Sequence, residues 1–179
     1  MDTVFLFNGP SKEVFAMNRK FFTSLAAAGL LACTVISAQA APVSQETSAS
    51  YIQRTKTGSS LEAEAYRLVN QQRQANGLPP LAADFSLGAI ARIKSRDMAA
   101  NNYFDHTSPT YGSPFTMMKS LGISYTSAGE NIAKGYHSAA DVVAAWMASD
   151  SHRVNLLSTA YTAMGIGYFN GYWTQWLIS

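Results

Sequence analysis

The C-terminal end of the chain contains the feature that most restricts its possible folds, a two-residue turn between two strand-like runs. Asn170-Gly171 separates residues 164–169 from residues 172–178, and both runs are rich in aromatic side chains. Asn-Gly is a strong signal for a tight β-hairpin, because both turn positions need a positive φ. We therefore expect an antiparallel hairpin whose aromatic residues belong to the core and the sheet faces rather than to a base-stacking platform.

The chain before this hairpin favours helices, because its apolar residues recur at helical spacing. Asp84, Ser113 and Ser138 are each placed to cap a helix start, and Pro114 suits a first helical position. The predicted helices are residues 61–76, 85–101, 114–121 and 139–149. Residues 123–126 are expected to form a short strand, and residues 127–136 a loop-like or irregular extended segment. Helices followed by strands predict an α+β fold, with an antiparallel sheet covered by helices.

An export signal is predicted near the N-terminus. Arg19 and Lys20 precede an apolar run, residues 21–36, which ends in the small-residue sequence Ser37-Ala38-Gln39-Ala40. A basic stretch, an apolar core and an A-x-A cleavage site are typical of a secretory signal peptide. We assign residues 17–40 to this signal, residues 1–16 to an upstream extension from a misplaced start, residues 41–60 to a flexible linker and residues 61–179 to one folded domain.

Cys33 leaves an alternative open, because Leu30-Leu31-Ala32-Cys33 resembles a lipobox and a lipidated cysteine would anchor the protein to a membrane. Cleavage after Ala40 would instead give a secreted or periplasmic protein with no cysteine, stabilised by packing alone. That mature chain would carry ten Lys plus Arg and nine Asp plus Glu, a net charge of 10 − 9 = +1. This balance argues against nucleic acid as a partner, and we expect a monomer without a transmembrane anchor.

Three polar clusters contain the candidate chemistry. They are residues 102–109 with His106, residues 128–133 with Glu130, and residues 150–155 with His152. We predict that His106, Glu130 and His152 meet in one cleft. Two imidazoles and a carboxylate form a common ligand set for zinc or another divalent metal and also suit acid–base catalysis. His137, beside a helix start, is interpreted as a residue that only hydrogen-bonds its loop.

Known catalytic motifs are missing from the sequence. It contains no H-E-x-x-H helix, no G-x-S-x-G elbow and no phosphate-binding loop. A Ser–His–Glu arrangement, with Ser108, Ser149 or Ser151 as nucleophile, remains open, although no neighbouring sequence indicates an oxyanion hole. We therefore name no confident catalytic residue, keep His106, Glu130 and His152 as candidates, and expect no defined enzymatic activity and no required cofactor.

Taken together, the motifs of residues 61–178 resemble those of bacterial CAP-domain proteins, in the superfamily of cysteine-rich secretory proteins, venom antigens and pathogenesis-related proteins. The matching pieces, in the family's order, are residues 69–73, 77–81, 104–109, 129–133, 145–149, 152–157, 165–167 and 172–175. The resemblance implies an α–β–α sandwich, secretion, and a central cleft that in some members holds two histidines and two acids and binds a divalent metal.

Two positions depart from that tetrad. His106 and Glu130 match the first histidine and the first acid, but Ser149 stands where the second acid is expected and Tyr172 where the second histidine is expected. Bacterial members carry instead a His-Arg-x-Asn cluster, here residues 152–155. We expect the cleft to be lined by His106, Glu130, His152, Ser149 and Tyr172. The candidate metal ligands are His106, Glu130 and His152. The expected binding partner is a small molecule, a lipid or a cell-envelope component. A metal-assisted extracellular hydrolase using the same cleft is the alternative.

Overall fold

The computed structural model describes residues 7–8 and 48–179, which form five helices and one five-stranded sheet. The helices are α1 (Ser48–Ala75), α2 (Phe85–Ala100), α3 (Pro114–Ser120), α4 (Ala139–Ala148) and α5 (Asp150–Leu156). The strands are β1 (Phe7–Asn8), β2 (Ala82–Ala83), β3 (Ser127–Lys134), β4 (Ala163–Phe169) and β5 (Tyr172–Ile178). Their order across the sheet is β1-β3-β5-β4-β2.

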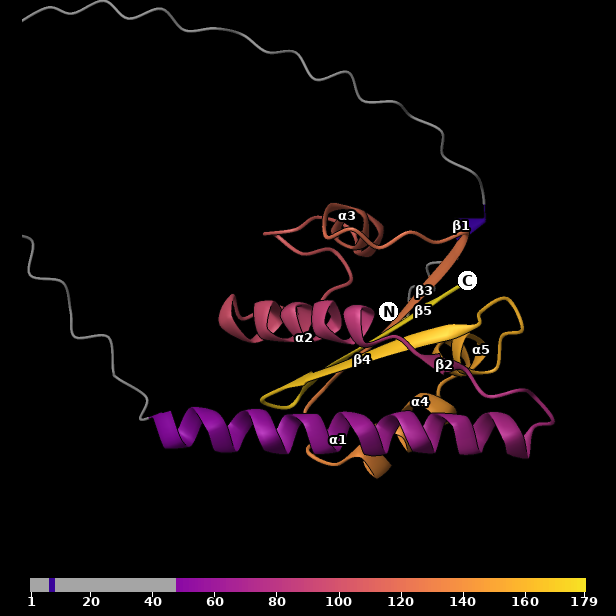
Figure 1. The fold of residues 1–179 in the computed structure, drawn as a ribbon, viewed down its shortest axis with the longest axis horizontal. Helices are drawn as coiled ribbons and strands as arrows, with labels where there is room; N and C mark the ends of the chain where they lie inside the picture. Colours follow the sequence, from indigo (N-terminus) through magenta and orange to yellow (C-terminus); the bar gives the residue numbers. More distant parts are fainter. Residues whose placement is uncertain (1–6, 9–47) are drawn as a thin grey trace, which may run out of the picture.

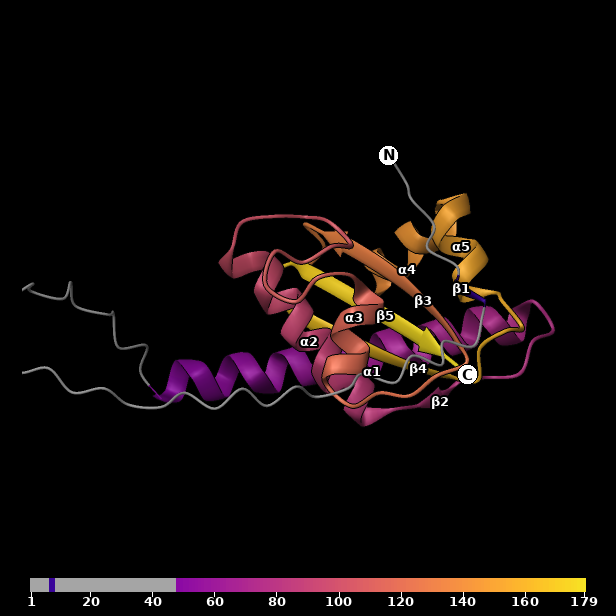
Figure 2. The same cartoon turned by 90° about the horizontal axis from the view of Figure 1, so that it is seen from above.

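Helices cover both faces of this sheet, so the predicted α+β fold with an α–β–α sandwich is confirmed (Figure 1, Figure 2). On one face, α1 and α4 pack with Trp173 and Leu177 in the larger hydrophobic cluster. On the other face, α2 and α3 pack with Trp176 and Ile178 in a second cluster. Because neighbouring strand residues point to opposite faces, consecutive residues of β5 contribute to both clusters.

The contact between α2 and β4 is unusually close. An added Cβ at Gly165 would lie 2.3 Å from the Gly88 backbone nitrogen, and one at Gly167 would lie 2.1 Å from the Arg92 backbone nitrogen. Both distances are shorter than any side chain tolerates, so helix and strand meet backbone to backbone. These two glycines thus fix α2, with the side chains it carries, directly over the sheet.

The predicted helix caps and the predicted hairpin turn, which depend only on neighbouring residues, are confirmed. The side chain of Asp84 caps α2, Ser113 caps α3 and Ser138 caps α4, each by accepting a backbone N–H. Asn170 and Gly171 both have positive φ, 47° and 82°, and join β4 to β5 as the predicted hairpin. The 150–155 cluster lies within helix α5.

Two predictions for residues 123–136 are wrong. Residues 123–126 form no strand, whereas β3 (Ser127–Lys134), expected to be irregular, pairs with β5 along all seven registered positions from Ala128↔Ile178 to Lys134↔Tyr172. The polar residues Glu130 and Asn131 suggested a loop, but both are buried in this strand. Their side chains find hydrogen-bond partners inside the fold, which removes the usual cost of burying them.

The first helix is longer than predicted. It begins at Ser48, so residues 48–60 of the expected flexible linker are helical. A short polar segment rarely forms a helix alone, but it can extend one that tertiary packing already holds. That packing comes from Ala65 and Val69, which are fully buried further along α1.

Several predictions fall on residues whose structure is not described. The signal peptide of residues 17–40, Cys33 and nearly all of the upstream extension of residues 1–16 lie outside the described residues. Within that extension, Phe7–Asn8 forms β1, which pairs antiparallel with Ser127 and Ala128 at the start of β3. In the part of the chain that the structure describes, no helix combines the length and apolar character needed to cross a bilayer.

Candidate functional site

The candidate site is centred on a histidine–glutamate pair. Nδ1 of His106 lies 2.5 Å from Oε1 of Glu130. The second carboxylate oxygen, Oε2, accepts a hydrogen bond of 2.5 Å from the indole N–H of Trp176. The Glu130 side chain is completely buried, whereas 15% of the His106 side chain is accessible. Solvent and any ligand dissolved in it therefore reach the pair through the imidazole.

The sheet places Glu130 for these contacts. In the antiparallel register of β3 and β5, Glu130 is directly opposite Trp176, and side chains at opposite positions lie on the same face. That face is the one covered by α2 and α3, because Trp176 belongs to their hydrophobic cluster. The buried carboxylate is stabilised by the indole donor and by the histidine, since a buried charge needs hydrogen-bond partners.

His106 lies in the loop after α2, and Lys94 of α2 holds that loop. Nζ of Lys94 donates to the backbone oxygens of Asp105, at 2.9 Å, and His106, at 2.7 Å. The ammonium also lies 5.0 Å from the centre of the Tyr103 ring, a cation–π distance. Lys94 is almost fully buried. Burial lowers its pKa, and the attraction of Glu130 is the largest effect opposing that shift.

Asp97, one turn further along α2, fixes the rest of the loop. Its carboxylate accepts hydrogen bonds from the side chains of Ser108, Tyr103, Thr110 and Asn101. Burial acts to raise the pKa of Asp97, but the four donors together outweigh it and leave the pKa below the usual 3.8. Burial and the bond to Asp97 raise the pKa of the Tyr103 phenol. The loop is thus anchored to α2 at both ends.

The opposite face of β3 carries an amide network. Asn131 donates to Oε1 of Gln175 at 2.9 Å and to the backbone oxygen of His152 at 3.2 Å. Asn155 of α5 donates to Oδ1 of Asn131 at 2.9 Å and to the backbone oxygen of Glu130 at 3.2 Å. Since Glu130 and Asn131 are neighbours in one strand, their side chains point to different faces. The 152–155 cluster therefore braces the strand that carries Glu130.

The other predicted site residues make contacts of their own. The hydroxyls of Ser149 and Ser151 are 2.9 Å apart at the junction of α4 and α5. Tyr172 is buried at the start of β5, with the ammonium of Lys134 5.0 Å from its ring centre. Oγ of Ser108 donates to Asp97 and accepts the backbone N–H groups of two following residues, so it braces the loop. Whether Ser149 and Tyr172 line a cleft with His106 stays a prediction.

The structure joins His106 to Glu130 and places His152 through its backbone oxygen beside Asn131. Among residues 60–179, no three His, Cys, Asp or Glu side chains are grouped so that they could hold a metal ion. The metal site with His152 as third ligand therefore stays a prediction. His137, interpreted as a loop residue, has Nδ1 3.4 Å from the Tyr168 hydroxyl.

Sequence reasoning missed Lys94, Asp97 and the role of Trp176. Lys94 follows Leu87 and Ile90 by seven and four residues, so it occupies the apolar stripe of its helix. A charged residue in such a stripe is the available signal, because a buried charge requires a partner. The partner itself, a backbone oxygen eleven or twelve residues later, is fixed only by the loop conformation.

Chemically, an imidazole supported by a buried carboxylate suits hydrogen bonding to a ligand or proton transfer. Together with the α–β–α sandwich, it defines the class of protein, a CAP-type domain with an acidic residue on strand β3 and a histidine on the loop over it. Residues 66–175 match the CAP model of the cysteine-rich secretory protein family, and the chain belongs to that family.

Relatives of known sequence agree with this assignment. An uncharacterized protein of Bacillus subtilis (strain 168), YkwD, is 48% identical over 143 residues, which are 79% of this chain and 56% of that protein. An uncharacterized membrane protein of the same strain, YlbC, is 37% identical over 114 residues, covering 64% of this chain and 33% of the relative. The match thus spans about half of the length of YkwD and about a third of the length of YlbC.

Solved structures show the same fold. An extracellular protein of Bacillus anthracis containing an SCP domain superposes with a TM-score of 0.70 at 31% identity, over 71% of this chain and 43% of that one. A cysteine-rich secretory protein of Staphylococcus aureus gives a TM-score of 0.60 at 20% identity, over 76% of this chain and 40% of that one. An outer surface protein of Borrelia burgdorferi gives a TM-score of 0.59 at 21% identity, over 64% of this chain and 88% of that one.

Proposed function

We propose that this protein is a secreted CAP-domain protein that binds a small molecule, a lipid or a cell-envelope component at His106, with no defined catalytic activity. The observation that carries the proposal is the pair itself, in which a fully buried Glu130 holds a partly accessible His106. The similar B. anthracis and B. burgdorferi proteins are described as extracellular and outer surface proteins, which supports secretion.

The way in which the pair is supported favours binding. Both carboxylate oxygens of Glu130 are held, one by His106 and one by Trp176. The loop is held through Lys94 and Asp97, so the imidazole has a fixed position before any ligand arrives. A pre-positioned polar group loses little conformational entropy on binding, which is the usual basis of specificity at a small polar site.

Co-sedimentation with purified cell-wall sacculi tests the proposal for an envelope ligand. The wild type and His106→Ala are mixed with sacculi, and circular dichroism checks that both are folded. His137→Ala is the matched control, because it removes a histidine outside the pair. We expect His106→Ala to weaken binding by about tenfold or more, the effect of one lost charge-assisted hydrogen bond, and His137→Ala to bind like the wild type. Equal binding by all three proteins would refute an envelope ligand at His106.

The same proteins distinguish the alternative, a metal-assisted extracellular hydrolase. Casein and a fluorogenic phospholipid serve as substrates, with added zinc and with a chelator. A hydrolysis rate that needs zinc and that His106→Ala abolishes in a folded protein would establish the hydrolase and overturn the binding function. Hydrolysis that His106→Ala leaves unchanged would assign the activity to a contaminant or another site.

A further inference from the structure

The outer edge of β4 is open over a short stretch on the far side of the sheet from β3. At one end, the backbone N–H of Asp84 donates to the Met164 oxygen at 3.0 Å. Four residues along the strand, the backbone N–H of Tyr168 donates to Oε1 of Glu62 in α1 at 2.8 Å. Because alternate residues of a strand face the same edge, Ile166 between them directs its N–H and C=O outward too. Within the described residues, no other element is seen to bond these two groups.

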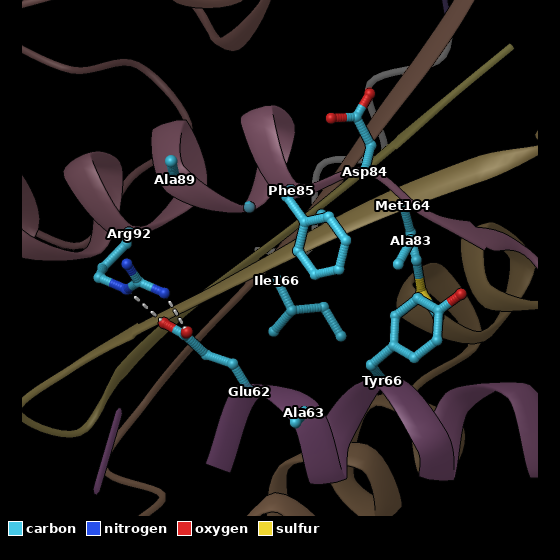
Figure 3. A pocket seen from close by; sticks show the side chains of 12 residues that line it. Glu62, Ala63, Tyr66, Ala83, Asp84, Phe85, Ala89, Arg92, Met164 and Ile166 are labelled. Carbon is cyan, nitrogen blue, oxygen red and sulfur yellow. Dashed lines mark hydrogen bonds and ion pairs between the residues drawn. The ribbon is translucent and has the colours of Figure 1, made fainter. Parts of the chain in front are cut away.

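A groove lies in front of this open edge, between α1 and α2 (Figure 3). It has a volume of about 350 Å³, and its lining includes the side chains of Tyr66, Phe85, Met164 and Ile166. Figure 3 shows the side chains of Phe85 from α2 and Tyr66 from α1 next to that of Ile166. Phe85 is 88% exposed, which is unusual for a large apolar residue.

One residue of α2 keeps the edge uncovered. A Cβ added at Gly88 would lie 3.5 Å from the backbone oxygen of Ile166 and 3.8 Å from its nitrogen, which is ordinary van der Waals contact. An alanine therefore fits at this position, and it would favour the helix. Glycine instead leaves space over the two outward groups of Ile166.

We propose that this groove binds an extended peptide segment of another protein. The segment would continue the line of β2, exchange two backbone hydrogen bonds with Ile166 and place an apolar side chain against Phe85 and Tyr66. A peptide is the ligand that offers an N–H and a C=O at strand spacing together with an apolar side chain, and addition to a free strand edge is a recurrent mode of peptide recognition.

The ends of the groove limit the segment. Asp84 closes one end of the free edge, and the ion pair of Glu62 with Arg92 closes the other. Residues 165–167 lie between the two closed positions, Met164 and Tyr168, which are about 13 Å apart along the strand. The groove thus accepts about three extended residues, and the central one faces Ile166. The site shares no residue with the His106–Glu130 pair.

Selection of random heptapeptides displayed on phage, with the wild-type protein immobilised, supplies the probe. The selected peptide is synthesised with a fluorophore, and its affinity is measured by fluorescence polarisation. We expect Gly88→Ala to weaken binding by about tenfold or more, because the new methyl covers both groups of Ile166. Its melting temperature should equal or exceed that of the wild type. Ser86→Ala, an exposed position of α2 outside the groove lining, is the matched control and should bind normally.

Backbone methylation of the peptide tests the pairing itself. N-methylation at one position of the peptide should abolish binding, because it removes the N–H that donates to the backbone oxygen of Ile166. The peptide's side chains stay unchanged. Failure to select any peptide, equal binding by Gly88→Ala, or tolerance of N-methylation at every position would each overturn the proposal. Self-association that Gly88→Ala removes would also overturn it, because the edge would then pair with a second copy of this chain. All of these results are independent of binding at His106.

Discussion

Replacing Gly167 with alanine tests the claim that α2 rests on β4 backbone to backbone. The new Cβ would lie 2.1 Å from the Arg92 nitrogen, 2.2 Å from the Ala91 carbonyl carbon and 2.5 Å from the Arg92 Cα. None of these atoms belongs to a flexible side chain that can move aside. Normal van der Waals contact begins at 3.4 Å, so the helix or strand must move by about 1.3 Å, the difference between 3.4 and 2.1 Å.

The expected cost follows from that displacement. Overpacking a core typically destabilises a protein by about 1–3 kcal/mol, and a clash between two backbones belongs at the upper end of this range. For a domain of this size, about 3 kcal/mol lowers the melting temperature by roughly 10 °C. The shift of α2 also moves Lys94 and Asp97, so the loop of His106 should loosen together with the global loss of stability.

Thermal unfolding followed by circular dichroism measures the effect, and hydrogen exchange of the loop amides reports the position of α2. Gly88→Ala is the matched control, because its methyl group meets only ordinary contacts. The free energy of unfolding of Gly88→Ala should increase by about 1 kcal/mol, because alanine favours a helix more than glycine does. A Gly167→Ala protein as stable as the wild type, with unchanged loop exchange, would refute the close contact.

Three further substitutions address the supports of the site. Asp97→Asn should cost about 1–3 kcal/mol near pH 7 in urea unfolding. Because the folded pKa of Asp97 is lowered, this contribution exists above 3.8 and disappears as the pH falls through the folded value, so the variant should lose less stability in acid. In the wild type, the free energy of unfolding should rise as the pH approaches 10.5, because burial lowers the folded pKa of Lys94. Lys94→Met should remove this rise; equal slopes of unfolding free energy against pH in the two proteins would contradict this. Trp176→Phe leaves Oε2 of Glu130 without its indole donor and should cost about 2–3 kcal/mol in the same assay; an unchanged unfolding midpoint would contradict this bond.

Local features of this fold were predictable because their causes are local. The helix starts at Asp84, Ser113 and Ser138 depend on a side chain that accepts a backbone N–H three residues later. The Asn170-Gly171 turn depends on the φ angles of those two residues alone. The same reasoning placed His106 and Glu130 in polar clusters worth examining, and the structure joins them.

Strand β3 was not predictable in the same way. Its polar residues resemble a loop until Glu130 meets Trp176 and Asn131 meets Gln175, partners that lie more than forty residues later. The start of α1 at Ser48 likewise depends on packing further along the helix. In each case a long-range contact outweighs the local preference, as expected when buried polar groups find partners.

By itself, the sequence determined the α+β class, the hairpin, most of the helices and the identity of the residues that can carry chemistry, because apolar spacing, caps and turns act over a few residues. Only the tertiary structure decided which of those residues meet. It placed Glu130 and Asn131 on opposite faces of one strand, so that His106 pairs with Glu130 while the His152 backbone oxygen joins the amide network behind it. It also left the edge of β4 open beside Gly88. Both outcomes depend on strand register and on the distance between α2 and β4, which are set when the whole core packs.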